Sequence, residues 1–368
     1  MIPTFDIYKG KKILVTGHTG FKGSWLSIWL KLLKADVHGL SLNIPTTPSN
    51  FEVSNLAEHI NDNRLDITNF ESIHKFISTL QPDFIFHLAA QPLVRQSYKD
   101  PLKTIMTNAI GTSNILNSIN QINKPVTAIL ITSDKVYDNR ELQRGYLEND
   151  MLGGKDPYSA SKGMAELAIK TFFHSYFKEP NSLVKIGIAR AGNVIGGGDW
   201  AEDRIIADCI RAWSLGEKVK IRNPDSTRPW QHVLEPLSGY LTLGSNLFKS
   251  NKLNGESFNF GPKANQNYSV RELISQMKKY WSDVQWVESS QLKNNMHEAN
   301  LLQLNCDKAF SEIHWSPVLE FDETIKLTTT WYKNFYENPK SNLYKFSENQ
   351  INEYINIAKR RFVNWSMQ

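Results

Sequence analysis

The stretch KILVTGHTGFKGSW, residues 12–25, decides the fold of this chain. An apolar run typical of a strand leads into three glycines, Gly17, Gly20 and Gly23, and then into a run typical of a helix. The first glycine allows a sharp turn, the second lets backbone approach a pyrophosphate, and the third allows close packing of the helix, whose N-terminus favours negative charge. The stretch predicts a dinucleotide-binding turn, with a tight turn that binds no ligand as the alternative.

The first half of the chain repeats this order of strand and helix. Strand patterns are expected at 12–17, 36–42, 83–89, 126–133 and 184–196, and helix patterns at 25–33, 71–80 and 104–119. Alternation of this kind predicts an α/β fold, a Rossmann-type doubly wound parallel sheet with helices on both faces. The binding site is expected at the carboxyl ends of the strands.

Changes in composition mark the expected domain boundaries. Residues 1–190 are expected to form the cofactor-binding domain, which also carries the candidate catalytic residues. Residues 191–330, where Pro, Trp, Asn and Gly become frequent, would form mainly a smaller α/β lobe that binds the substrate. Residues 331–368 would form a helical tail, in which Ser347 is the expected N-cap of an amphipathic helix.

The composition limits the class of protein. The 368 residues are 40% hydrophobic and 21% charged, and no apolar run reaches the roughly 18 residues of a membrane span. The first residues lack the apolar core of a signal peptide, so a cytoplasmic protein is expected.

Cys209 and Cys306 have no further ligand at metal-binding spacing, and the net charge of +5 is spread along the chain. We therefore expect no metal and no nucleic acid, whereas an anionic small substrate fits the charge.

A candidate catalytic helix begins at Asp156–Pro157 in the string DPYSASKGMAEL. Tyr158 and Lys162 are four residues apart, so both side chains project from one face of this helix. A tyrosine of pKa about 10 is a poor base, but a nearby ammonium group favours phenolate. Ser133, at the end of the preceding core strand, would hydrogen-bond the reacting hydroxyl or carbonyl. The alternative is that the tyrosine and the lysine are two unrelated residues on a helix.

Two further residues follow Ser133 in the string TSDKVYD. Asp134 and Lys135 supply an acid and a potential base beside the predicted triad. A plain dehydrogenase has no need of this pair. The alternative is that the aspartate caps a turn and the lysine points to water.

These motifs resemble the extended short-chain dehydrogenase/reductase family over roughly residues 11–310. That family combines a TGxxGxxG turn, a strand-end aspartate as in RLDITN, a small-residue strand end as in HLAAQ, and a Ser/Thr, Tyr and Lys triad. The resemblance implies an NAD cofactor. The residues that it places at the cofactor are Gly17, His18, Gly20, Phe21, Lys22, Gly23, Asp66, Ile67, Leu88, Ala89, Ala90, Tyr158 and Lys162.

The cofactor end departs from the family pattern in two places. His18 stands where a smaller residue is more common, and its imidazole would either crowd the pyrophosphate or supply an extra donor. After the second strand, Ser41 and Asn43 occupy the place where a ribose-binding aspartate commonly sits, and no arginine for a 2′-phosphate is near in the sequence.

Further strings resemble the sugar-nucleotide 4,6-dehydratases, and among them the CDP-glucose enzymes. Ser133, Asp134 and Lys135 match the Thr-Asp-Glu string of dehydratases with Ser for Thr and Lys for Glu, the change that favours the CDP-glucose group. GNVIGGGDWAEDRI, RNPDSTRPWQHV and HEANLLQLNCDKA agree with that group. The resemblance implies that the substrate is bound by Asn193, Arg204, Arg228 and His297. The planar fork of an arginine suits a diphosphate, although an arginine that bonds loop carbonyls is the competing interpretation for residue 228.

The resemblance implies a reaction in three steps. Tyr158, assisted by Ser133 and Lys162, would take the C4 hydroxyl proton as hydride leaves C4, which gives a 4-keto sugar. Lys135, if neutral, would take the C5 proton while Asp134, if protonated, protonates the departing C6 hydroxyl. Hydride would then return to C6. A product of this kind serves the synthesis of surface-polysaccharide deoxysugars such as those of O-antigen.

Other functions and the assembly remain open from the sequence. A nucleotide-sugar 4-epimerase would use the same fold and triad, and a non-catalytic dinucleotide-binding regulatory protein would use the fold alone. The base of the nucleotide is not settled. The resemblance implies a homodimer or homotetramer that pairs through the helix of Tyr158 and the helix before it. Within that earlier helix, the stripe of Ile105, Ala109, Thr112 and Leu116 is either core or partner-facing.

Overall fold

A seven-stranded parallel sheet forms the centre of the computed structural model, which describes residues 5–142, 144–281, 284–288 and 302–367. The strands follow the order β11-β6-β5-β4-β1-β2-β3, and each neighbouring pair is parallel. Their bounds are β1 Lys12–Thr16, β2 Asp36–Ser41, β3 Asn61–Arg64, β4 Phe84–His87, β5 Val126–Ile131, β6 Val184–Ala191 and β11 Ser257–Phe260. This confirms the predicted Rossmann-type α/β fold.

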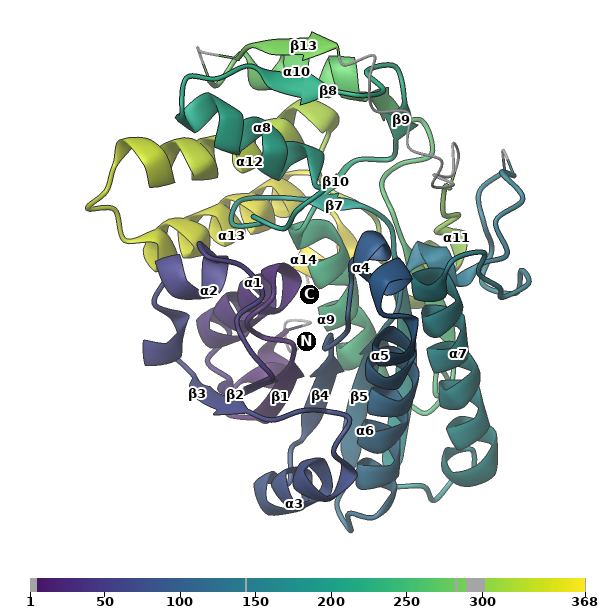
Figure 1. Ribbon diagram of the computed structural model, residues 1–368. Coiled ribbons are helices and arrows are strands. Elements are labelled where there is room, and N and C mark those ends of the chain that lie inside the picture. The colour runs from purple at the N-terminus through teal and green to yellow at the C-terminus, as the bar shows by residue number, and fades with distance from the viewer. Residues whose placement is uncertain (1–4, 143, 282–283, 289–301, 368) are drawn as a thin grey trace.

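Helices cover both faces of the sheet, and α5, α6 and α7 lie on the near face in Figure 1. The α-helices are α1 Phe21–Leu32, α2 Asn50–Val53, α3 Phe70–Leu80, α4 Val94–Lys99, α5 Pro101–Ile105, α6 Gly111–Asn120, α7 Pro157–Phe172, α8 Ile205–Ser214, α9 Leu234–Lys249, α10 Val270–Met277, α11 Asp307–Ile313, α12 Phe321–Glu337, α13 Leu343–Arg360 and α14 Asn364–Met367. Short 3-10 segments are η1 Asp6–Tyr8, η2 Leu56–Glu58 and η4 Asp134–Val136, and π-helical turns are η3 Met106–Ile110 and η5 Phe173–Phe177.

Successive residues of the central strands enter two different cores. Leu14 of β1 packs with Ile77 of α3 and Leu116 of α6, whereas its neighbours Ile13 and Val15 pack on the opposite face. Side chains alternate across a strand, so a run that is apolar at every position belongs to a strand buried on both faces. This accounts for the unbroken apolar character of KILV.

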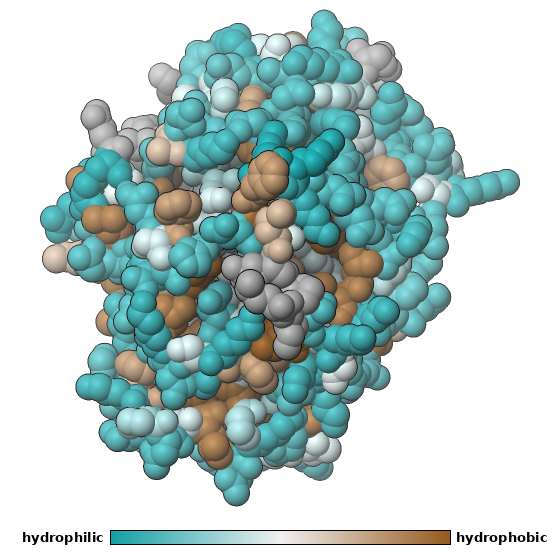
Figure 2. Space-filling model, turned by 180° about the vertical axis from the view of Figure 1, so that it is seen from behind, coloured by the Kyte–Doolittle hydropathy of each residue, from teal (hydrophilic) through white to brown (hydrophobic). Residues whose placement is uncertain are grey.

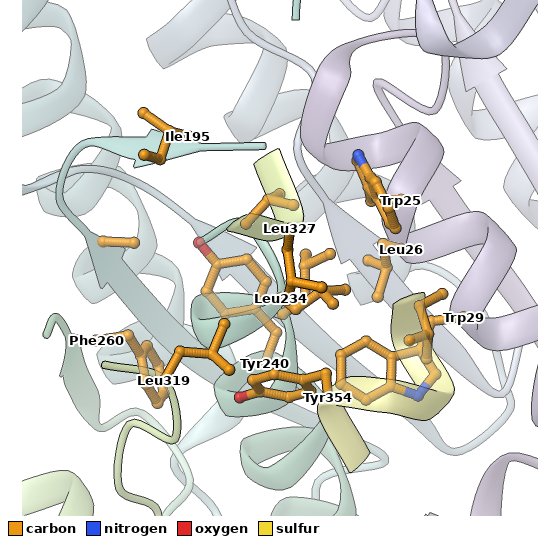
Figure 3. Packing of buried hydrophobic residues seen from close by; sticks show 14 of the residues in the cluster. Trp25, Leu26, Trp29, Ile195, Leu234, Tyr240, Phe260, Leu319, Leu327 and Tyr354 are labelled. Carbon is orange, nitrogen blue, oxygen red and sulfur yellow. The ribbon is translucent and has the colours of Figure 1, made fainter. Parts of the chain in front are cut away.

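The core on the face of the sheet to which Ile13 and Val15 point contains residues from both the start and the end of the chain. Figure 3 shows Trp25 and Trp29 of α1 beside Leu234 of α9 and Tyr354 of α13. The rings of Trp29 and Tyr354 meet edge to face with centroids 5.8 Å apart. Large aromatic side chains bury much apolar surface, so this cluster holds the C-terminal helices onto the cofactor-binding half.

Residues 331–367 contain the end of α12, all of α13 and α14, and the predicted helix start at Ser347 is wrong. The α13 helix begins at Leu343, because the Asn342 side chain caps it by accepting a hydrogen bond from the backbone N–H of Lys345 at 2.9 Å. Ser347 is buried inside the helix, where its hydroxyl accepts from the indole N–H of Trp331 at 2.9 Å.

Smaller elements follow β6 at the end of the sheet where the predicted site lies, and α8 and α10 lie with them at the top of Figure 1. They are three two-stranded pairs: β7 Val194–Ile195 with β10 Gln231–His232, β8 Val219–Ile221 with β13 Trp286–Glu288, and β9 Thr227–Arg228 with β12 Tyr268–Ser269. β11 then returns to the main sheet beside β6.

The outer surface is mainly hydrophilic in the view of Figure 2. Among the described residues, no helix combines the length and the apolar character that crossing a membrane requires. The predicted stripe on α5 to α6 belongs to the core, because Ala109, Thr112 and Leu116 are buried and Ile105 is half-buried.

Candidate active site

The glycine-rich turn between β1 and α1 has the close contacts that its sequence predicts. Gly17 has a φ of +77°, and a Cβ there would lie 2.7 Å from the backbone nitrogen of Ala89. A Cβ on Gly23 would lie 2.1 Å from the carbonyl oxygen of Gly17. Gly20 is the N-cap of α1. The turn therefore holds backbone amides and a helix N-terminus against the end of β4, an arrangement that favours an anion.

His18 does not present its imidazole as a free donor for a phosphate. The side chain is fully buried against Gly39, with Nδ1 3.0 Å from the Ser41 hydroxyl and Nε2 2.8 Å from the Asp62 carboxylate. Burial lowers its pKa. Both ring nitrogens already have partners, so the side chain of this predicted cofactor residue ties the turn to β2 and β3.

An arginine does lie near the end of β2, contrary to the sequence expectation. Arg64 on β3 is the register partner of Ser41, and its guanidinium lies 5.1 Å from the centre of the Phe51 ring. It also pairs with Asp62 at 2.9 Å. The arginine is distant in sequence and reaches this place only because β2 and β3 are adjacent.

The other predicted cofactor residues lie along the ends of β3 and β4. Asp66 accepts hydrogen bonds from the backbone N–H and the hydroxyl of Thr68 at 2.9 and 2.8 Å. Ile67 is buried, and its side chain occupies the space next to Gly111 where a Cβ would be. Leu88, Ala89 and Ala90 follow β4 directly. A further residue, Asn108, holds this segment: its side chain bonds the backbone N–H and carbonyl of Gln91 at 2.8 and 3.1 Å.

Lys22 is a cation in the first turn of α1, where the helix dipole disfavours positive charge. Burial lowers its pKa to about 8, and Asp134 and Asp199 partly offset that effect. It has no ion-pair partner among the residues that the structure describes. Its neighbour Phe21 lies against Gly196 of the substrate lobe. The turn thus carries an unpaired charge between the cofactor end and the substrate end.

The structure brings Ser133, Asp134 and Lys135 together at the end of β5. The serine hydroxyl accepts from the Lys135 backbone N–H at 3.2 Å, and it donates to Oδ1 of Asp134 at 2.8 Å. Burial raises the pKa of the aspartate, which the nearby lysine charge partly offsets. A raised pKa is what an acid that must stay protonated requires. The aspartate is buried, and the side chain that caps this turn is that of Ser133, contrary to the interpretation in which Asp134 is the cap. Lys135 is half-buried.

Tyr158 and Lys162 project from α7, which begins as predicted: Asp156 caps it by accepting from the Ser159 N–H at 3.0 Å. Both side chains are buried. Burial raises the pKa of Tyr158 to about 12, against a hydrogen bond with Ser133 and the charge of Arg204, which lower it. Burial lowers the pKa of Lys162 to about 8. Burial has the largest effect on the Tyr158 phenol, so its pKa lies above the ordinary value, and the action of the Lys162 ammonium on it stays a prediction.

The four predicted substrate residues have different surroundings. Arg204 is the N-cap of α8 and interacts electrostatically with Tyr158, Asp199 and Lys22, so it lies near the predicted catalytic tyrosine. Asn193 lies between β6 and β7. Arg228 donates to the Thr227 carbonyl at 2.8 Å, the kind of contact that the structural alternative predicts. His297 lies outside the described residues.

Sequence reasoning missed a group of charges beside Arg204. Asp203, which has a φ of +60°, accepts from Arg95 of α4 at 2.6 Å, and Arg222 lies 3.8 Å from the same oxygen. These residues come from three separate segments without a local motif. Only their convergence in space shows that two arginines border the loop that follows β7.

The chain is similar to known nucleotide-sugar enzymes along almost all of its length. The GDP-mannose 4,6 dehydratase family model matches residues 14–328. The chain is 42% identical over 359 residues to the CDP-glucose 4,6-dehydratase of Salmonella typhimurium. The aligned residues cover 96% of this chain and 99% of that protein. It is 24% identical to a UDP-glucose 4-epimerase of Mycoplasma pneumoniae, over 88% of this chain and 97% of that protein.

Solved structures share the fold. An epimerase of Methanothermobacter thermautotrophicus has a TM-score of 0.76 at 23% identity, over 92% of this chain and 97% of that one. A UDP-glucuronic acid 4-epimerase of Bacillus cereus, solved with UDP-glucuronic acid and NAD, has a TM-score of 0.73 at 22% identity, over 88% of this chain and 100% of that one. With the family match and the 42% identity, the chain belongs to the GDP-mannose 4,6 dehydratase family, within the extended short-chain dehydrogenases/reductases.

Proposed function

We propose that this protein is an NAD-dependent hydro-lyase that converts CDP-glucose to CDP-4-keto-6-deoxyglucose and water. The observation that carries the proposal is the buried Asp134 beside Lys135, next to Ser133 and Tyr158 at one strand end. The 42% identity to a CDP-glucose 4,6-dehydratase over nearly the full chain supports the same reaction and the same nucleotide.

The residues at the cofactor end fit NAD. The turn of Gly17 and Gly23 leaves no room for a Cβ, α1 points its N-terminus at the same place, and Lys22 supplies an unpaired cation. Bound NAD supplies hydride transfer chemistry, and the reaction returns it to its starting state. The chain's own residues bind it, orient it and move the protons.

Tyr158, in its phenolate form, takes the proton of the C4 hydroxyl in the first step. Burial opposes ionisation of the phenol, while the hydrogen bond with Ser133 and the charge of Arg204 favour it. The resulting ketone at C4 acidifies the C5 hydrogen. Lys162, one helical turn along α7, keeps a positive charge next to this centre at neutral pH.

Asp134 and Lys135 carry out the elimination. Burial raises the pKa of the aspartate and so favours its protonated form, which can give its proton to the departing C6 hydroxyl, which leaves as water. Lys135, in its neutral form, takes the C5 proton and later returns a proton to C5. The hydrogen removed from C4 reappears at C6. An epimerase, which returns it to C4, would have no use for this pair.

A direct assay tests the proposal. The purified protein is incubated with NAD and, separately, with CDP-, dTDP-, UDP- and GDP-glucose, and products are followed by the alkaline ultraviolet absorbance of 4-keto-6-deoxy sugars. We expect turnover with CDP-glucose. A hexose that is inverted at C4 and keeps its C6 hydroxyl would contradict dehydration and establish a 4-epimerase.

The protein is proposed to act as a homodimer or homotetramer in the cytoplasm, where nucleotide sugars and NAD are available. Apolar side chains on α5, η3 and α7 face outward and are not covered by the chain itself. The most exposed are Leu102, Met106, Ile110, Met164 and Leu167, with exposed fractions between 42% and 74%. Contiguous exposed apolar residues on neighbouring helices are typical of a protein interface. They replace the stripe on α6 as the candidate dimer surface.

A further inference from the structure

Tyr240 of α9 carries a buried hydroxyl that bonds nothing among the described residues. The side chain is completely buried, and its ring meets Phe260 edge to face with centroids 5.7 Å apart. An unpaired buried hydroxyl destabilises the folded state, because it has lost its hydrogen bonds to water without gaining one in the protein. A phenylalanine would keep the packing without this cost, so the oxygen itself calls for an explanation.

Tyr240 belongs to a helix that packs against the strands leading to the predicted catalytic residues. α9 packs on β5 and β6, and these strands lead directly into Asp134 and Gly192. Oδ2 of Asp134 is 3.3 Å from the place of a Cβ on Gly192. Figure 3 shows the Tyr240 oxygen directed away from Tyr354 and toward the strand of Ile195, three residues after Gly192.

Two catalytic groups interact with this tyrosine. Asp134 and Tyr158 both act electrostatically on the Tyr240 phenol, and burial together with these two groups raises its pKa far above the ordinary value. Tyr240 therefore keeps its proton throughout the reaction and can only donate a hydrogen bond to an anion. It is not a second base.

We propose that Tyr240 is a positioning residue for Asp134: its hydroxyl donates a hydrogen bond to the carboxylate that forms when Asp134 has protonated the departing C6 oxygen. The proton passes from Asp134 to the leaving group, water departs, and Tyr240 retains its own proton. This role rests on the proposed dehydratase function. It assigns Tyr240 to the elimination step and not to the oxidation at C4.

The chemistry of the aspartate explains why the donor is unpaired at rest. Neutral Asp134 is already bonded to Ser133 through Oδ1, and a neutral carboxyl is a weaker acceptor than a carboxylate. Proton donation creates a buried negative charge, which is costly unless hydrogen bonds meet it. Catalytic hydrogen bonds often tighten only once substrate is bound. A donor held ready beside the acid lowers the barrier to elimination.

Tyr240→Phe tests the proposal, with Tyr354→Phe as the matched control. Tyr354 is also buried, but its hydroxyl donates to Glu235 at 2.8 Å, so the control loses a formed hydrogen bond. With CDP-glucose, single-turnover kinetics would follow the reduced cofactor for the C4 oxidation and the alkaline absorbance for the elimination. The control should lower the melting temperature and leave both rates within about twofold.

We expect Tyr240→Phe to keep or raise the melting temperature, to change the C4 oxidation less than about twofold, and to slow elimination at least about tenfold. Elimination requires Asp134 in its protonated form, so its rate should fall as the pH rises through the pKa of this carboxyl. In the variant this fall should move to higher pH, because the carboxylate has lost a hydrogen-bond donor and the pKa of Asp134 is higher. Normal elimination, equal slowing of both steps, or destabilisation like that of the control would overturn the proposal. If the wild-type protein dehydrates no glucose nucleotide, the proposed function itself fails, which the unmodified protein shows first.

Discussion

Glu166 of α7 and Arg190 of β6 form an ion pair in which both side chains are completely buried. The Arg190 Nε donates to Glu166 at 2.7 Å, and Thr132 donates to the same carboxylate oxygen at 2.7 Å. Glu166 is one helical turn after Lys162, and Thr132 directly precedes Ser133. Glu166 therefore ties α7 to β6 through Arg190, and to the strand end that carries the acid and the serine through Thr132.

Arg190→Met should destabilise the protein by about 3–5 kcal/mol, because it leaves a buried carboxylate without its counter-charge. Urea unfolding measures this loss. The double variant with Glu166→Met should recover much of it, since neither charge remains. Lys326→Met, which breaks an exposed pair with Glu353 at 3.1 Å, is the control and should cost about 0–1 kcal/mol. A single variant as mild as the control would contradict the assigned role.

Tyr158→Phe should lower turnover of CDP-glucose at least about a hundredfold, because it removes the group that accepts the C4 proton. The ring and its packing remain, so nucleotide binding measured by calorimetry should stay near the wild-type value. Turnover that is undiminished would remove Tyr158 from the mechanism.

Lys135→Met keeps most of the side chain's stem and removes the proposed C5 base. The variant should still form the 4-keto sugar and reduced cofactor, while water elimination slows by about a hundredfold or more.

In deuterium oxide the wild-type product should carry deuterium at C5, and the original C4 hydrogen should be found at C6 by NMR. A wild-type product without deuterium at C5 is incompatible with this step.

Lys22→Met should weaken NAD binding about 10- to 100-fold, the equivalent of a charged hydrogen bond of about 1.5–3 kcal/mol. In the protein without bound cofactor, the pKa of Lys22 is about 8, and a bound phosphate favours the charged form of this lysine. Wild-type affinity should therefore fall as pH rises above 8, where binding must take up a proton, and this fall should be shallower in the variant. Lys31→Met, at the other end of α1, is the control. Identical pH dependence in wild type and Lys22→Met would exclude a phosphate contact.

Leu167→Glu should shift the protein from dimer or tetramer toward monomer, because it places a charge in the middle of the exposed apolar surface on α7. Light scattering at micromolar concentration measures the mass. Leu215→Glu, an equally drastic change at an exposed leucine elsewhere, should leave the assembly intact. A wild-type protein that is already monomeric would contradict the proposed interface.

Features that depend on residues close together in the chain could be predicted from the sequence. The turn at Gly17 and the close approach at Gly23 follow from KILVTGHTGFKGSW, because only glycine tolerates those backbone contacts. The start of α7 follows from Asp156 and Pro157, which cap a helix locally. The parallel sheet follows from apolar strands that alternate with helices, since both faces of such strands must be buried.

The hydrogen-bond partners of the site residues and the shifts of their pKa values depend on the folded arrangement and could not be predicted from the sequence. His18 turns to Ser41 and Asp62, and Arg64 reaches the end of β2, because strand register brings together residues that no local pattern links. Burial, a property of the whole fold, raises the pKa of Tyr158 and leaves the hydroxyl of Tyr240 without a hydrogen-bond partner among the described residues. Desolvation acts through everything packed around a group, so spacing along the chain can identify a catalytic side chain but not its protonation or its supports.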